Sequence, residues 1–449
     1  MSTASNASMF STPEMDSIFT ISRQLQLMTR FEWALAAALE AHGIAETGAA
    51  AALVPFLNAE FVDLESLIAD ARKSGNLAIP FVHQLTSAVR SRSEPAARHI
   101  HFGATSQDVF DSALVLQLCE AGALVRYGLK ALDAALERLA REQRNTIMAG
   151  RTWLQTGPPI TLGLKVAGWL SAVRRHQKRF AEAEERALTL QFGGAVGTLA
   201  VLGEKGLAVS HTLAQTLELK EPDLPWHAHR DNLAELAADL GLLVGTLGKM
   251  ARDVSLLMQT EVGEAAEPAG EGRGGSSTMP HKHNPVASAQ ILAAAARVPA
   301  LVSTILGAMS QEHERGLGNW QAEWETIPDI YRLSAGALAR AVEIADRLDV
   351  DRERMLVNLE SNYGLAMSEA VSAALTGRVG RTQAHEWLQH ASRQALAEKK
   401  QLLDVLLEMP EVREHFGETE LKRLLDPENY LGSARQFIDR VLGADDEIR

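Results

Sequence analysis

The chain has 449 residues, of which 46% are hydrophobic, so it is long enough for more than one hydrophobic core and too apolar to be disordered. Its net charge of −13 argues against a nucleic-acid-binding surface, and its single cysteine, Cys119, excludes a disulfide framework and suits a reducing compartment. Aromatic residues are only 5% of the chain and alternating β-branched runs are scarce, so we expect an all-α protein.

The ends and apolar runs of the chain predict a cytoplasmic protein. The polar start, residues 1–11, lacks the basic and apolar stretches of a signal peptide. The run nearest to a membrane span, Val286 to Met309, contains Arg297 and Pro299. We therefore expect no membrane partner.

The N-terminal part predicts a small helical domain, residues 1–110. Between Thr20 and His42, apolar residues recur at spacings of three and four, so a long helix should begin near Ser22 and end at Gly43. Shorter helical stretches, interrupted by proline and glycine, follow to about Arg98.

Residues 111–350 predict a central bundle of long helices, with further long segments near 112–145, 161–190 and 286–310. From Asp231 to Glu261, leucines and other apolar residues repeat every seven positions, which is typical of a seam between packed helices. One chain offers too few partners for such seams, so we expect a homo-oligomer. Pro299 should kink its helix, and residues 351–449 should form a third helical domain.

The loop 263–285 is the most informative segment of the chain. Its last part, residues 274–285, reads Gly-Gly-Ser-Ser-Thr-Met-Pro-His-Lys-His-Asn-Pro, and several glycines precede it. Hydroxyls, a cation, an amide and permissive backbone between long helices indicate an active-site lid.

The order of residues in this loop resembles the signature of the fumarase/aspartase superfamily, Gly-Ser-Ser-x-Met-Pro-x-Lys-x-Asn-Pro, which residues 275–285 match at every fixed position. The resemblance implies a homotetramer and the addition or elimination of a group β to a carboxylate, through an aci-carboxylate. It makes Ser276 the general base, with Ser277 as the rival, while Lys282 and Asn284 would stabilise the developing charge.

Two further segments extend the resemblance. Residues 101–108, His-Phe-Gly-Ala-Thr-Ser-Gln-Asp, have the form of a region in which Thr105 and Ser106 bind a substrate carboxylate, with His101 or Gln107 adding contacts. The alternative is a helix N-cap before Asp108, and one residue can do both.

The second segment, residues 151–158, includes Gln155, a substrate-binding candidate, and departs from the pattern of the amine-expelling lyases. Trp153 stands where they carry a histidine that acts as general acid or base, and Ala289 stands where a supporting glutamate is expected. Because both halves of the pair are replaced together, we interpret the site as rebuilt for a reaction that needs less help in protonating its leaving group.

That requirement fits the cycloisomerase branch of the superfamily, which residues 153–163, 192–198 and 279–286 also resemble. In this branch a carboxylate of 3-carboxy-cis,cis-muconate adds within the same molecule to give the γ-lactone 4-carboxymuconolactone, a step of aromatic catabolism. Intramolecular attack makes positioning a large share of the catalysis. A tricarboxylate needs several cations, and the candidates besides Lys282 are Arg315 and, less strongly, His281, His283 and His313, each of which could instead lie in a surface ion pair.

Other possibilities stay open from sequence. One is an amine-expelling member such as adenylosuccinate or argininosuccinate lyase, and a more remote one is a non-catalytic structural homologue. The alternating pairs His281/His283 and His227/His229 have no third ligand at a fixed spacing, so we expect no metal and no cofactor. We expect composite active sites in the tetramer, because the hydroxyl turn and the signature loop fall in different predicted domains.

Overall fold

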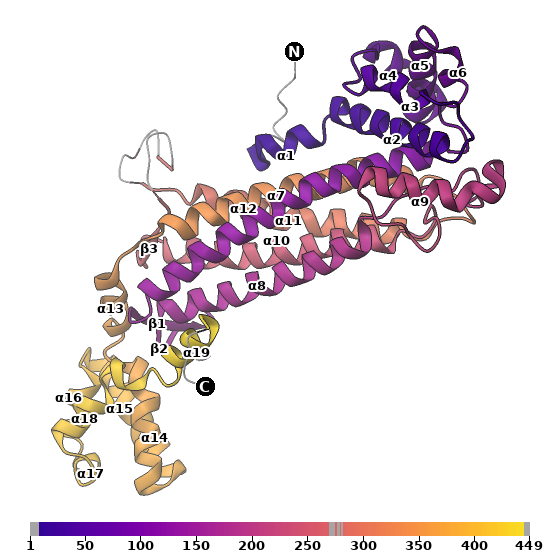
Figure 1. Cartoon of the computed structure of the whole chain (residues 1–449). Coiled ribbons are helices and arrows are strands. Elements are labelled where there is room, and N and C mark those ends of the chain that lie inside the picture. The colour runs from indigo at the N-terminus through magenta and orange to yellow at the C-terminus, as the bar shows by residue number, and fades with distance from the viewer. Residues whose placement is uncertain (1–8, 269–273, 276–278, 280–281, 444–449) are drawn as a thin grey trace. The chain divides into compact units, whose positions relative to one another are not determined.

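The computed structural model describes residues 9–268, 274–275, 279 and 282–443. Helices dominate this part of the chain, and its strands form only two small two-stranded sheets (Figure 1). The prediction of an all-α fold with minor strands is therefore confirmed.

The elements follow one another with short connections. Up to residue 230 they are α1 (Pro13–Ile18), α2 (Ile21–Ala41), α3 (Ala49–Leu53), α4 (Leu64–Ser74), α5 (Ala78–Arg90), α6 (Glu94–Ala97), α7 (Ser106–Glu142), β1 (Ile147–Thr152), β2 (Gln155–Thr161), α8 (Leu162–Ala187) and α9 (Gly206–Leu217). The remainder are α10 (Asp231–Leu257), β3 (Ala265–Ala266), α11 (Val286–Ala308), α12 (Asn319–Arg347), β4 (Asp349–Val350), α13 (Arg352–Glu360), α14 (Ser368–Val379), α15 (Arg381–Glu398), α16 (Leu402–Glu408), α17 (Pro410–Arg413), α18 (Glu418–Leu424) and α19 (Ala434–Val441).

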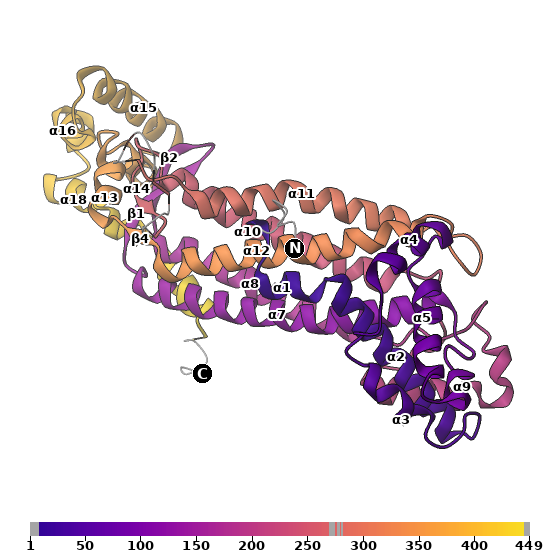
Figure 2. The same cartoon turned by 90° about the horizontal axis from the view of Figure 1, so that it is seen from above.

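The chain divides into two compact units, and each contains a length of the five long helices α7, α8, α10, α11 and α12 (Figures 1 and 2). Unit 1 comprises Met1–Leu129, His176–Gly245 and Ala293–Ala339, and unit 2 comprises Lys130–Arg175, Thr246–Leu292 and Arg340–Arg449. The three-domain division at residues 110 and 350 stays a prediction.

In unit 1, α2 is the helix predicted from the spacing of apolar residues after Thr20. The Thr20 hydroxyl caps it by accepting a hydrogen bond from the Arg23 N–H at 3.1 Å, so the helix begins at Ile21. Its apolar face is buried. After the helix, His42 Nε2 contacts the Thr212 hydroxyl of α9 at 2.8 Å, which ties the two helices together.

The apolar seam of α10 is buried within the single chain. The eight residues Leu233, Leu236, Leu240, Leu243, Leu247, Met250, Val254 and Leu257 are each at most 4% exposed. The helix is as predicted, but the premise that one chain offers too few partners for it is wrong. The other long helices already cover the seam, so it gives no argument for an oligomer.

α11 carries the apolar surface that the chain does not cover. It continues through Pro299, and by length and composition alone it could cross a membrane, but only 28% of its most apolar stretch is buried within the chain. A helix that packs in a bundle passes the same test of length and composition. The exposed part of α11 is thus a candidate surface for self-association.

In unit 2, β1 and β2 form an antiparallel hairpin whose turn consists of Trp153 and Leu154. Both turn residues have positive φ angles, 52° and 62°, which places the tip in a left-handed conformation. The C-terminal helices pack around their own apolar core, which includes Val371, Leu402 and Leu421.

Candidate active site

The hydroxyl turn before α7 combines a helix cap with a cationic contact. α7 begins at Ser106, and the Thr105 N–H donates to Asp108 Oδ2 at 2.9 Å, so the carboxylate of Asp108 caps the helix. The Thr105 hydroxyl instead accepts from Arg315 Nη1 at 2.9 Å. The capping alternative therefore holds for Asp108, while the hydroxyl of Thr105 faces a cation.

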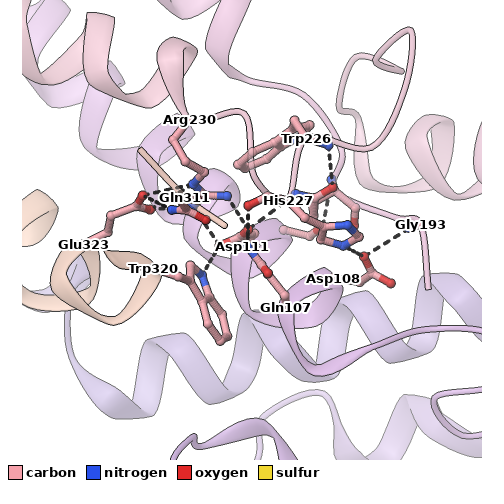
Figure 3. A network of polar contacts seen from close by, with 12 residues as sticks. Gln107, Asp108, Asp111, Gly193, Trp226, His227, Arg230, Gln311, Trp320 and Glu323 are labelled. Carbon is pink, nitrogen blue, oxygen red and sulfur yellow. Dashed lines mark hydrogen bonds and ion pairs between the residues drawn. The ribbon is translucent and has the colours of Figure 1, made fainter. Parts of the chain in front are cut away.

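Asp108 connects three segments of unit 1 behind this turn (Figure 3). Besides the Thr105 N–H, its buried carboxylate accepts from the N–H groups of Gly193 and Gly194, at 3.1 and 2.9 Å, and from His227 Nε2 at 2.7 Å. A Cβ on Gly193 would lie 2.6 Å from the Pro225 side chain, so only glycine fits this approach. The carboxylate thereby fixes the turn relative to both loops.

A buried ion network supports the next turn of α7 (Figure 3). Arg230 is fully buried, with Nη1 2.6 Å from Asp111 Oδ2 and Nη2 2.5 Å from Glu323 Oε2. Burial alone would lower the pKa of Arg230, but the two carboxylates raise it, so the guanidinium stays charged. Trp320 Nε1 adds a hydrogen bond to Asp111 Oδ1 at 2.9 Å. The network joins α7, the start of α10 and α12 at one point.

Arg315 is the cation of unit 1 best placed to bind an anion. It is half-buried, and besides Thr105 it makes only a long contact of 3.5 Å to the Ala195 carbonyl. Burial lowers the pKa of Arg315, and the charges of Asp108 and Asp111 oppose this, but an arginine remains protonated. No carboxylate of the described chain forms an ion pair with it, which leaves its charge available to a ligand.

The other candidates in unit 1 lie differently. Ser106 is the first residue of α7 and is partly exposed, and His101 is bound by the buried Glu32. His313 is exposed, with a φ of 46°. The structure thus brings Thr105 to Arg315 across 210 positions of sequence, and it shows no such contact for His313 within the described residues.

In unit 2 the described end of the signature loop lines a cavity of about 730 Å³. The loop contributes Met279, Lys282, His283, Asn284 and Pro285 to the wall, and the end of α10 contributes Ser255 and Met258. Lys282 and His283 are exposed, and the Asn284 N–H donates to the Gly274 carbonyl at 2.8 Å, which closes the base of the loop. Ser276, Ser277 and His281 lie outside the described residues.

Glu267 holds the other side of this loop, and sequence reasoning missed it. Its two carboxylate oxygens accept from the N–H groups of Ala287 and Ser288, at 2.9 and 2.7 Å, at the N-terminus of α11. A carboxylate there satisfies free backbone donors and matches the helix dipole. Because the contact spans about 20 residues of loop, no local capping pattern marks it in the sequence.

The β1–β2 hairpin places its two candidates away from that cavity. Trp153 is 97% exposed and Gln155 is exposed, and neither belongs to the described residues that line the cavity. The base of the hairpin is held firmly, because Arg151 Nη2 lies 2.5 Å from Oε1 of the buried Glu264. Asn358 donates to the same oxygen at 2.8 Å. The hairpin therefore presents an aromatic side chain outward from a fixed base.

Comparison with known proteins defines the class. A family model described as lyase matches residues 11–300, and one described as adenylosuccinate lyase C-terminus matches residues 364–441. The chain belongs to this lyase family, the fumarase/aspartase superfamily indicated by the signature loop.

Individual relatives narrow the comparison. The chain is 49% identical to a 3-carboxy-cis,cis-muconate cycloisomerase of Pseudomonas aeruginosa over 96% of this chain and 94% of the other. The crystal structure of 3-carboxy-cis,cis-muconate lactonizing enzyme from Pseudomonas putida has a TM-score of 0.94 and 46% identity, and the match covers 98% of each chain. A nitrosuccinate lyase of Streptomyces davaonensis is 42% identical over 94% of this chain and 90% of its own length.

Proposed function

We propose that this protein is a cycloisomerase that interconverts 3-carboxy-cis,cis-muconate and 4-carboxymuconolactone in aromatic catabolism. The observation that carries the proposal is the joint replacement of the histidine and glutamate of the amine-expelling lyases by Trp153 and Ala289. The full-length similarity to proteins named for this reaction supports the same conclusion.

The chemistry follows from charge. In the lactonizing direction, one substrate carboxylate adds to a carbon β to another, and the electron pair moves onto that second carboxylate as an aci-form. Lys282, Asn284 and loop N–H groups stabilise this dianion, while Thr105, Ser106 and Arg315 hold a further carboxylate. A proton then goes to the α-carbon from Ser276, so three carboxylates and one proton become a lactone with two carboxylates.

The reverse reaction explains why the lost pair is dispensable. Ser276 removes the α-proton and the ring oxygen leaves as a carboxylate, a stable anion that needs no acid. An amine leaving group does need one, and the exposed indole of Trp153 cannot supply a proton to it. Adenylosuccinate and argininosuccinate should therefore be poor substrates. Nitrosuccinate is a sharper competitor, because nitrite also leaves as a stable anion.

The quaternary arrangement is part of the same proposal. We infer a cytoplasmic homotetramer in which the hydroxyl turn of one subunit and the signature loop of another complete each active site. Two features of the chain support this inference: the two groups of candidate residues belong to different units, and α11 exposes an apolar face. Gln155, Trp153, His283 and His313 would contribute from exposed positions that an assembly can cover.

The test is a spectrophotometric assay of the purified protein with 3-carboxy-cis,cis-muconate, whose conjugated diene absorbs in the ultraviolet and is lost on lactonization. We expect turnover that a chelator does not affect, and no turnover of adenylosuccinate or argininosuccinate. Robust cleavage of either amine substrate, or of nitrosuccinate in preference to the muconate, would overturn the proposal.

Ser276→Ala provides the control for the chemistry. The variant should keep the helical circular dichroism and the oligomer size of the parent, because the residue belongs to a loop and not to the helical seam. Retention of more than about a tenth of the parent kcat would remove Ser276 from the role of base.

A further inference from the structure

Unit 1 contains a glutamate–histidine pair that the mechanism above does not use. Glu32 lies in the middle of α2 and is 1% exposed, and its Oε1 accepts from His101 Nδ1 at 2.6 Å. Its Oε2 accepts from the His101 backbone N–H at 2.8 Å. One carboxylate therefore fixes both the backbone and the ring of His101.

The geometry leaves the second ring nitrogen for a ligand. His101 has a φ of 60°, unusual for a residue with a Cβ, and its side chain is 18% exposed although its partner is buried. With Nδ1 engaged, Nε2 is the nitrogen that remains, and it makes no hydrogen bond to the described part of the chain. A strained histidine held by a buried carboxylate is a costly arrangement for a turn that needs only a backbone acceptor.

The pair also favours the charged ring. Burial lowers the pKa of His101, but the charge of Glu32 and its hydrogen bond, with the charge of Asp108, raise it, and the net direction is upward. Glu32 on α2 and Asp108 on α7 are the charged groups of the described chain that act on this ring. A neutral hydrogen-bonding partner in place of Glu32 would remove most of this preference.

We propose that Glu32 is a positioning residue that holds His101 as an imidazolium and directs its Nε2–H to one carboxylate of the substrate, next to the carboxylate held by Thr105 and Arg315. The inference rests on the proposed function and deepens it. It assigns a second cationic donor to the hydroxyl turn, four residues before Thr105, in a chain that must hold three carboxylates at once.

This role has a defined pH dependence. Because the folded-state pKa of His101 is raised, the ring is protonated below that pKa and loses its charge as the pH rises through it. Substrate binding should therefore weaken toward alkaline pH. In Glu32→Gln the pKa falls, so the same weakening should begin at lower pH.

The first measurement is the titration of His101 in the free protein. Carbon-13-labelled histidine gives one ring signal for each residue, and the His101 signal is the one missing from His101→Gln. We expect the His101 midpoint to lie above the ordinary histidine value in the parent and to fall in Glu32→Gln. The amide oxygen that this substitution introduces can still accept from the His101 N–H, so the turn is retained. Equal midpoints in the two proteins would overturn the proposal.

The second measurement is calorimetric binding of propane-1,2,3-tricarboxylate, a saturated tricarboxylate that cannot react. Glu32→Gln should bind it about tenfold more weakly than the parent at pH 7, the effect expected for one charge-assisted hydrogen bond. Glu40→Gln is the matched control, because Glu40 also lies on α2 and accepts backbone N–H bonds, from Gly48 and Ala50. Equal affinity of Glu32→Gln and Glu40→Gln would overturn the proposal.

Kinetics on the muconate complete the test. Glu32→Gln should raise KM about tenfold and change kcat by less than about threefold, since the contact is made with substrate and transition state alike. Glu32→Asp, which keeps the charge, should recover part of the loss. If the parent protein does not turn over the muconate, the proposed function fails, and the titration and binding measurements still decide the role of Glu32.

Discussion

The turn of unit 1 and the loop of unit 2 offer cations to a substrate in opposite ways. Behind Thr105 and Arg315, the buried groups Asp108, Asp111 and Arg230 lock several segments together. Around Lys282 the support consists of a backbone hydrogen bond and the carboxylate of Glu267, and the ammonium itself is exposed. The first region is built before the substrate arrives, while the second depends on what covers it. We therefore expect mutations in the first to affect folding and those in the second to affect catalysis.

The largest effect on stability should come from Arg230→Met. Removing the guanidinium leaves Asp111 and Glu323 as buried carboxylates without a counter-ion, which should lower the free energy of unfolding by about 3–5 kcal/mol. Denaturant unfolding monitored by circular dichroism measures this change. Arg186→Met is the control, because its ion pair with Glu235 is exposed, and its midpoint should match the parent. A midpoint for Arg230→Met equal to that of the control would show that the network does not hold unit 1.

Lys282→Met should separate catalysis from folding in the loop region. Loss of one charge that stabilises the aci-carboxylate should reduce kcat/KM roughly a hundredfold to a thousandfold. Because the side chain is exposed, the unfolding midpoint should not change. Lys130→Met, an exposed lysine on α7, should leave both quantities at the parent value. A loss of less than about tenfold would remove Lys282 from the charge-stabilising role.

A smaller effect is expected for Glu267→Ala. The substitution frees the Ala287 and Ser288 N–H groups at the start of α11, at a cost of about 1 kcal/mol. Hydrogen exchange of these two amides should become faster, and kcat/KM should fall, because Asn284 lies just before the uncapped turn. Glu261→Ala, at an exposed position, is the control. Unchanged exchange would mean that Glu267 does not fix the loop.

Periodicity predicted the helices well, because it reports which face of each helix is buried. α2 begins at Ile21, and the heptad seam of α10 is buried along its length. Periodicity cannot identify the partner, however. It suggested a second subunit for a seam that helices of the same chain cover. The apolar surface left for a partner is on α11 instead.

The candidate site was predictable only where a motif is contiguous. Lys282 and Asn284 follow from the signature loop, and Asp108 follows from the spacing of a capping box. Other contacts join residues that lie far apart in sequence, such as Glu32 with His101 and Asp111 with Arg230. A buried glutamate in an apolar helix face signals an unknown partner, and only the fold shows which residue it is.

The central claim is that the hydroxyl turn and the signature loop act in one site built from different subunits. The most direct test mixes two inactive proteins, Thr105→Val and Ser276→Ala, under conditions that allow subunit exchange. With random exchange, about a quarter of the sites should combine an intact turn with an intact loop, and muconate turnover should recover accordingly. No recovery, with mixed oligomers demonstrated by mass spectrometry, would contradict the account and place both regions of each site in a single chain.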